Sequence, residues 1–188
     1  PRRAALKARL ARTGRNISVG PFVLVCAILM LLTFLVMTRS FQFGTVLALM
    51  IAVTIGLGIP HFIIGQMGGR RMERFNSLFP DGLDIMVRGL RAGMPLQDSI
   101  TVVAKEISDP VGSEFRIIEQ TALFGQPLDQ ALADAAKRIQ TREFQFFVVS
   151  LSVQRETGGN LGETLSNLSD ILRRRQQMKL KVKAMSSE

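Results

Sequence analysis

The chain has 188 residues, of which 47% are hydrophobic, and its 24 Lys and Arg against 15 Asp and Glu give a net charge of +9. The charge is uneven: the segment before residue 70 has seven basic and no acidic residues, and the remainder has 17 basic and 15 acidic residues. Because the chain has no Trp or Tyr to stack on bases, a nucleic-acid partner is not expected. The single Cys excludes an intramolecular disulfide, and together with the single His it excludes the usual zinc sites.

Two long uncharged apolar runs follow a basic N-terminal segment at residues 1–18. They cover Val19–Met37 and Phe43–Ile64, about 19 and 22 residues, and about 20 helical residues span the hydrocarbon core of a bilayer. The connection between them carries one charge, Arg39, and has room only for a tight turn. The sequence therefore predicts a transmembrane hairpin of two antiparallel helices at residues 19–64.

Basic residues flank this hairpin on one side of the membrane. Six precede the first run, and Arg70, Arg71 and Arg74 follow the second, so the positive-inside rule places the N-terminus and everything after Arg70 in the cytoplasm. A secretory signal is the alternative, but its apolar core would have about 7 to 15 residues and would lead to an exported domain. The second run and its arginines favour a multi-pass membrane protein.

The second run carries a small residue at every fourth position, which places four of them on one helix face. Small residues at this spacing let helices approach closely in lipid, and we expect the stripe to pack against the first run. Its members are Gly44, Ala48, Ala52 and Gly56. Pro60 is then expected to kink or end the helix. A linker follows at residues 65–74, with a flexible joint expected at Gly65, Gly68 and Gly69.

The remaining residues, 75–188, form the predicted cytoplasmic domain, and three of its segments share one template. These are Gly93-Met94-Pro95-Leu96, Gly125-Gln126-Pro127-Leu128 and Gly158-Gly159-Asn160-Leu161. In each, the glycine is expected to close one helix as a C-cap. Pro95, Pro127 or Asn160 then stands where the next helix begins.

Apolar residues follow each of these glycines at identical offsets. Their 4-3-4 spacing is one buried stripe of an amphipathic helix. The three stripes are Leu96, Ile100, Val103, Ile107; Leu128, Leu132, Ala135, Ile139; and Leu161, Leu165, Leu168, Leu172. The pattern predicts three helical hairpins. A period of about 33 residues also suits tetratricopeptide or ankyrin arrays, but their signature residues are absent.

The first helix of each pair is expected to start near Pro80-Asp81-Gly82-Leu83-Asp84, Asp109-Pro110 or Thr141. Its apolar face consists of Leu83, Met86, Val87 and Leu90 in the first pair, Phe115, Ile118 and Phe124 in the second, and Phe144, Phe147, Val148 and Leu151 in the third. No segment alternates as a strand would. The predicted fold is all-α, a transmembrane helical hairpin followed by a cytoplasmic six-helix bundle.

The last helix extends beyond its stripe into a basic segment that contains Arg173, Arg174, Arg175, Lys179, Lys181 and Lys183. Segments of this kind are attracted to the anionic lipids of the inner leaflet, and we expect this one to mark a return to the membrane. We also expect the polypeptide to continue past Glu188 into at least one more span.

No set of residues points to catalysis, to a cofactor or to a metal ion. The sequence lacks the nucleotide-binding pattern G-x-x-x-x-G-K and the nucleophile elbow G-x-S-x-G. Carboxylate pairs such as Asp81 and Asp84, or Glu156 and Glu163, suit helix caps and solvated helix faces. We therefore expect a protein that is not an enzyme.

The third glycine turn differs from the other two because a charged pair, Arg155-Glu156, precedes its double glycine. Two explanations remain open. The turn is strongly capped, with Asn160 at the N-cap and Glu163 reaching back to it, or the charges contact a partner.

Three strings together resemble the type II secretion system F-domain family, and within it the TadB branch of the tight-adherence (Tad) pilus machinery. They are Leu78-Phe79-Pro80-Asp81-Gly82-Leu83-Asp84, Arg88-Gly89-Leu90-Arg91-Ala92-Gly93, and Gln154-Arg155-Glu156-Thr157-Gly158-Gly159-Asn160-Leu161. The resemblance covers residues 75 to about 185. The preceding apolar hairpin with its basic flank also fits.

The resemblance implies a platform protein of the bacterial inner membrane without a catalytic site. Such a protein couples a cytoplasmic secretion ATPase to extrusion of pilin, beside a second F-domain platform protein, in a homo- or hetero-oligomer. We expect the ATPase to contact exposed charges near the turns, with Arg88, Arg91, Arg155 and Glu156 as candidates.

Two other classes remain as alternatives. A transporter or channel subunit is disfavoured because neither run has an ionisable residue within the membrane core, where substrate paths usually have one. A membrane-anchored scaffold or receptor without a motor partner is separated from a platform protein only by the family resemblance.

Overall fold

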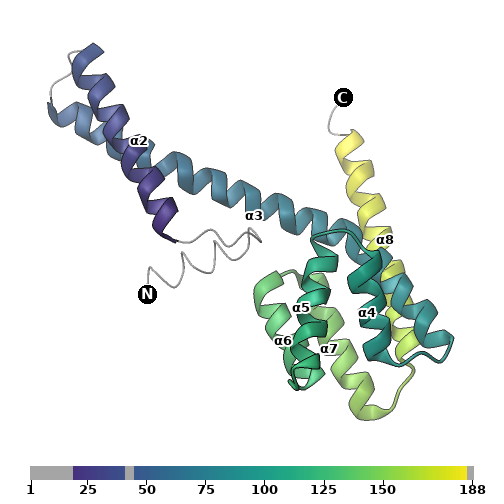
Figure 1. Cartoon of the computed structure of the whole chain (residues 1–188). Helices are drawn as coiled ribbons and strands as arrows, with labels where there is room; N and C mark the ends of the chain where they lie inside the picture. Colours follow the sequence, from purple (N-terminus) through teal and green to yellow (C-terminus); the bar gives the residue numbers. More distant parts are fainter. Residues whose placement is uncertain (1–18, 41–44, 186–188) are drawn as a thin grey trace. The chain divides into compact units, whose positions relative to one another are not determined.

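The computed structural model describes residues 19–40 and 45–185, and within these ranges all regular structure is helical (Figure 1). The helices are α2 (Val19–Ser40), α3 (Thr45–Arg91), α4 (Leu96–Glu106), α5 (Val111–Leu123), α6 (Leu128–Ile139), α7 (Arg142–Thr157) and α8 (Leu161–Met185). The chain divides into two compact units, Pro1–Arg71 (unit 1) and Met72–Glu188 (unit 2). The predicted all-α class is confirmed for the described residues.

In unit 1 the two predicted apolar runs are helical. α2 has 22 residues and covers the first run, and α3 begins two residues into the second. Within the described part of the chain, one helix segment, Leu49–Arg91, is long and apolar enough to cross a membrane, and Val23–Val36 is a shorter apolar helix. Large apolar side chains such as Leu31, Met50 and Phe62 point outward from these helices. Such surfaces suit a lipid environment.

Two of the four predicted stripe residues lie where α2 and α3 pack against each other. Ala52 is fully buried, and a Cβ added to Gly56 would lie 2.9 Å from Cβ and 3.0 Å from Cα of Met30. Because a methyl group at that position would overlap the α2 backbone, the glycine permits the close approach. Gly44 lies outside the described residues, and so does the side chain of Ala48.

Gly56→Ala is expected to lower the stability of the full-length protein in detergent, by about 1–3 kcal/mol as overpacking does. Gly58→Ala is the matched control, because a Cβ there meets nothing within 4 Å. The control should leave the melting temperature unchanged or raise it, since Ala favours a helix. Thermal unfolding followed by circular dichroism measures both. Equal melting temperatures for the two variants would contradict the packing of Gly56 on Met30.

α3 is longer than the sequence indicated. It runs without interruption through Pro60, through the expected linker at residues 65–74 and through Pro80. The predicted helix end at Pro60 and the predicted helix start at Pro80 are therefore wrong, and the three linker glycines are helical. Gly and Pro cost about 1 and 3 kcal/mol in a helix relative to Ala. Tertiary packing offsets these costs in the C-terminal part of α3, where Phe75 and Phe79 are fully buried.

The chain compensates directly for the proline at position 80. Pro80 has no N–H, so the carbonyl oxygen of Asn76 loses its usual helical donor. Nε2 of Gln176 in α8 donates to that oxygen at 2.8 Å, and to the carbonyl oxygen of Ser77 at 3.2 Å. The carbonyl oxygen of Pro80 in turn accepts a hydrogen bond from Oγ of Ser169 at 3.3 Å. α8 thus supplies the donors that make this proline acceptable within α3.

Gln176→Ala is expected to destabilise the full-length protein by about 1–2 kcal/mol, the cost of leaving a half-buried carbonyl unpaired. In a Pro80→Ala background the new N–H reaches the same carbonyl, and the same substitution should cost less than half as much. A double-mutant cycle of thermal unfolding in detergent measures the difference. Equal costs in the two backgrounds would show that Gln176 acts through packing alone.

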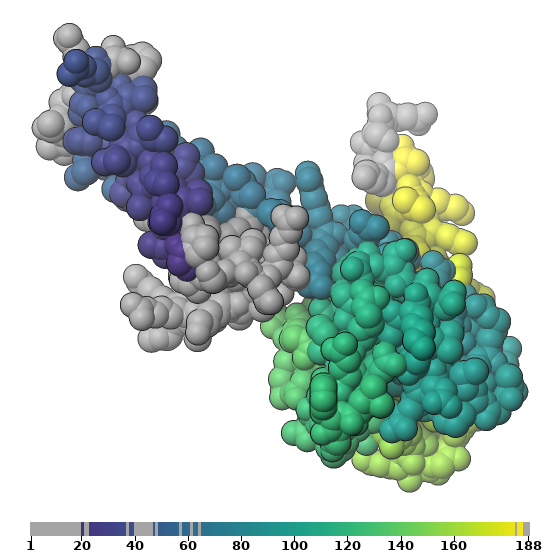
Figure 2. Space-filling model, viewed as in Figure 1, coloured from purple at the N-terminus to yellow at the C-terminus, as the bar shows by residue number. Residues whose placement is uncertain are grey.

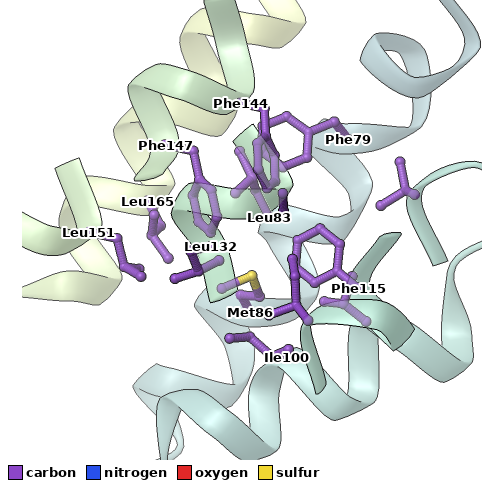
Figure 3. Close-up of a cluster of buried hydrophobic side chains, with 14 of the residues drawn as sticks. Phe79, Leu83, Met86, Ile100, Phe115, Leu132, Phe144, Phe147, Leu151 and Leu165 are labelled. Atoms are coloured by element: carbon purple, nitrogen blue, oxygen red, sulfur yellow. The ribbon is translucent and has the colours of Figure 1, made fainter. Parts of the chain in front are cut away.

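One hydrophobic core occupies unit 2, and the predicted stripes line it. Every residue of the three stripes is buried in this core or packs against it. At its centre lie five fully buried phenylalanine rings, and the centroids of neighbouring rings are 5.4 to 6.4 Å apart: Phe75, Phe79, Phe115, Phe144 and Phe147. Figure 3 shows four of them together with Leu83, Met86 and Leu132. Phe124, predicted to belong to this face, is instead 91% exposed.

The three glycine turns have the predicted geometry. Gly93, Gly125 and Gly158 have φ of 83°, 93° and 70°, a region that favours glycine, and the next helix begins three residues after each of them. In Figure 1 all three turns lie at the lower end of unit 2, which we call the glycine-turn end. Thr141 is the N-cap of α7, as expected, and accepts a hydrogen bond from the N–H of Phe144.

Asp109 does not cap the helix that starts after it. The N-cap of α5 is Pro110, and no side chain caps that helix. Asp109 instead pairs with Arg116, with Nη2 and Oδ1 2.5 Å apart. The predicted site of the helix start is correct, but the aspartate forms an ion pair with a residue seven positions further along the chain.

Candidate partner-binding surface

The four predicted contact residues are exposed and lie near the glycine-turn end. Arg88 and Arg91 are in the last turn of α3, and Arg155 and Glu156 are in the last turn of α7. The turns themselves are structural. They only bring the ends of α3, α5 and α7 and the starts of α4, α6 and α8 to one face of unit 2.

Arg155 is paired within the chain. Its Nη1 lies 2.5 Å from Oδ1 of Asp129 in the first turn of α6, and both side chains are more than one-third exposed. An exposed pair of this kind contributes about 0.2–1 kcal/mol to stability, so a partner can compete for either charge. Glu156 forms no ion pair in the described structure. Its carboxylate lies at the C-terminal end of α7, where the helix dipole disfavours negative charge.

The two arginines of α3 differ in their surroundings. Nη2 of Arg91 donates to Oγ of Ser166 in α8 at 3.3 Å, and its Cγ lies 3.7 Å from where a Cβ of Gly162 would be. Arg88 lines an open cleft of about 400 Å³ together with Met94, Ser99 and Glu106. The structure therefore places Arg91 against the start of α8 and Arg155 against the start of α6, rather than in one cluster.

The double glycine of the third turn has a structural explanation. Gly158 has a positive φ, and a Cβ on Gly159 would collide with Oε1 of Gln154. Oδ1 of Asn160 accepts a hydrogen bond from the N–H of Glu163 at 3.2 Å, which confirms Asn160 as the N-cap of α8. The side-chain amide Nδ2 of Asn160 donates to Oε2 of Glu163 at 3.5 Å, so the two side chains contact each other, but this is not the bond to the backbone N–H of a capping box. Capping therefore explains residues 158–163, and the preceding charged pair remains a candidate for partner contact.

A polar network between α3 and α8 was missed by sequence reasoning. Nη2 of Arg173 bonds Oδ1 of Asp81 at 2.9 Å and also bonds Oδ2 of Asp84, and Oγ of Ser169 donates to Oδ1 of Asp84 at 2.6 Å. The hydrogen bond with Asp84 is the main reason why the pKa of Arg173 is raised. The predicted role of the two aspartates at a helix start is wrong, because α3 has no end there. The sequence signal that could have indicated this network is the spacing of three residues between the two aspartates, because it places both on one helix face.

Asp134, in α6, is a partly exposed carboxylate whose pKa is lowered by its hydrogen bonds. Asp134 accepts hydrogen bonds from Lys137 at 2.9 Å and from Gln126 at 3.1 Å, and these bonds lower its pKa. A carboxylate whose pKa is lower in the folded state than in the unfolded state stabilises the fold at pH values above its unfolded-state pKa. This stabilisation is lost as the pH falls through its folded-state pKa. Because Asp134 is in solvent, this contribution is small.

The described residues contain no group of three or more His, Cys, Asp or Glu side chains that could hold a metal ion. Among the candidate contact residues at the glycine-turn end, Arg155 belongs to an ion pair and Arg88 lines an open cleft, whereas Glu156 is exposed and forms no ion pair in the described structure. This surface has the character of a contact face, with charges of both signs and exposed apolar side chains between them.

Comparison with known families identifies the family to which this helical domain is similar. The family described as type II secretion system (T2SS), protein F, matches residues 83–188, more than half of the chain. No curated protein and no solved structure matches the chain. Proteins of this family are non-enzymatic platform components of the inner membrane in type II secretion and pilus systems, and they interact with the secretion ATPase and other parts of the machinery. The chain belongs to the type II secretion system protein F family.

Proposed function

We propose that this family member is the inner-membrane platform protein of a Tad or type IV-like pilus assembly machine. It couples a cytoplasmic secretion ATPase to the extrusion of pilin and has no catalytic site of its own. The observation that carries the proposal is the family match over residues 83–188, together with one helix in the described residues that is long and apolar enough to cross a membrane and a shorter apolar helix before it. A second F-domain protein is its expected partner in the platform.

The Tad branch is supported by the three sequence strings that surround the core and the turns. Residues 78–84 contain Phe79, Pro80 and Leu83, all buried, and residues 154–161 contain the capped turn with its charged pair. The topology that we propose has two membrane helices, with the N-terminus and unit 2 in the cytoplasm, because the basic residues flank the apolar runs on that side. Three helical hairpins in one bundle complete the proposed domain.

A rigid cytoplasmic domain suits a part that transmits movement. The core of five phenylalanines keeps unit 2 rigid, because packed interiors deform little. We propose that the ATPase acts on the glycine-turn end.

Co-purification tests the proposed function. The full-length protein, extracted from its own membrane in mild detergent, should bring with it a hexameric secretion ATPase and a second F-domain protein, both identified by mass spectrometry. A stable complex with solute-transport components, and without such an ATPase, would instead show a regulatory subunit of a transporter. Recovery of the protein with neither class of partner would indicate a membrane-anchored scaffold.

Arg155→Glu is expected to abolish pilus assembly without lowering the protein level, because the broken ion pair with Asp129 contributes less than about 1 kcal/mol. The double variant Asp129→Arg/Arg155→Glu restores the ion pair in reverse orientation. It should remain without pili if Arg155 contacts the ATPase. Restored piliation in the double variant would mean that only the pair matters, and normal piliation in the single variant would remove Arg155 from the contact surface. Electron microscopy and immunoblotting measure the two quantities.

A further inference from the structure

The turn between α5 and α6 exposes two large apolar side chains side by side. Leu123 is 78% exposed and Phe124 is 91% exposed. The glycine turns have the same geometry, so their sequences can be compared position by position. The two residues before the glycine are Arg91-Ala92 in the first turn, Glu156-Thr157 in the third, and Leu123-Phe124 in the second.

Turn formation does not require these apolar residues. The turn is closed by backbone hydrogen bonds, from the N–H of Gly125 to the carbonyl oxygen of Ala122 at 3.0 Å and from the N–H of Gln126 to that of Thr121 at 3.3 Å. Neither of the other two turns has a large apolar residue at these positions, which are Arg91-Ala92 and Glu156-Thr157. Single exposed apolar residues are common on proteins, but an adjacent Leu and Phe at the tip of a turn present a contiguous contact surface.

A cleft of about 150 Å³ lies next to this pair, and Leu123 forms part of its wall. Ile100, Ala122 and Leu128 supply its apolar lining, and Gln97, Thr101, Asp98 and Glu119 supply its polar groups. Neither Asp98 nor Glu119 forms an ion pair in the part of the chain that the structure describes. The carboxylate of Asp98 lies at the start of α4, where the helix dipole favours negative charge. Glu119 lies within α5, where no helix dipole explains the presence of a carboxylate. Helices α4 to α6, which carry the cleft, form the near surface of unit 2 in Figure 2.

We propose that this cleft and the exposed pair Leu123-Phe124 bind a basic amphipathic helix of a cytoplasmic partner protein. A Lys or Arg of that helix meets Asp98 and Glu119, and its apolar residues cover Leu123 and Phe124. The binding surface is inferred independently of the proposed function. Only the identity of the partner rests on that function, which makes the secretion ATPase the source of the helix.

The charge of the cleft excludes two other occupants. An anionic bilayer surface attracts basic segments, so two carboxylates at the rim disfavour it. A second copy of the chain that contacts the first through the same face would place the carboxylates of both copies near one another, because a two-fold contact pairs a surface with itself. Complementary charge therefore favours a basic partner.

Site-specific photo-crosslinking in the native cells tests the proposal on the full-length protein. A photoreactive phenylalanine analogue replaces Phe124, and the same analogue at Ala92 and at Thr157 provides matched controls at the equivalent positions of the other two turns. The probe at 124 should form an adduct with a partner protein, and the crosslinked peptide should belong to an amphipathic helix with apolar residues on one face and basic residues beside it. Neutralising the rim with Asp98→Asn/Glu119→Gln should reduce this adduct about tenfold. The control substitution Asp134→Asn, which neutralises a carboxylate outside the cleft, should leave the adduct yield unchanged.

Several results would overturn the proposal. They are an adduct with lipid alone, an adduct with a second copy of the chain, a yield at 124 no higher than at 92, and a yield that does not respond to the loss of the two carboxylates. An adduct on a basic helix of a protein other than the ATPase would support the binding surface and count against the proposed function. An adduct on the ATPase supports both.

Discussion

The packing of α8 against the C-terminal part of α3 is the constraint on which unit 2 depends. These helices are the first and last of the unit, so their contact closes it. Buried apolar side chains supply most of the stabilisation of unit 2, with phenylalanines from α3, α5 and α7 and leucines from α8, since a fully buried large apolar side chain contributes about 1.5–3 kcal/mol. The polar bonds from Gln176, Ser169 and Arg173 contribute less, but they specify how α8 is placed along α3. They also make a proline acceptable inside a long helix.

This closure separates structural residues from residues available for contact. The motif residues Pro80, Asp81 and Asp84 face α8, and the double glycine and Asn160 shape a turn. What remains free at the glycine-turn end is a set of exposed side chains that differs from turn to turn. Three turns of equal geometry thus present three different surfaces, one with arginines, one apolar beside carboxylates, and one with a charged pair. A platform protein gains its partner specificity from such differences on a rigid scaffold.

Unit 1 follows other rules because its surface suits lipid. Its helices expose leucines, methionines and a phenylalanine that a water-facing surface would not favour, and α2 and α3 approach closely through Gly56 rather than through large interlocking side chains. The same helix α3 is therefore apolar on its outside in one unit and amphipathic in the other.

The sequence by itself determined the features that depend on local conformation. Glycines at the turns, the 4-3-4 stripes, the N-caps Thr141 and Asn160, and the two apolar runs all reflect preferences of a few neighbouring residues. The tertiary structure alone decided that α3 passes through Pro80, because the compensating donor, Gln176, is 96 positions further along the chain. It also decided that Asp84 pairs with Arg173, that Arg155 pairs with Asp129, and that Phe124 faces solvent. Helical periodicity indicates which residues share a face, but only the packing of distant helices decides which face is covered.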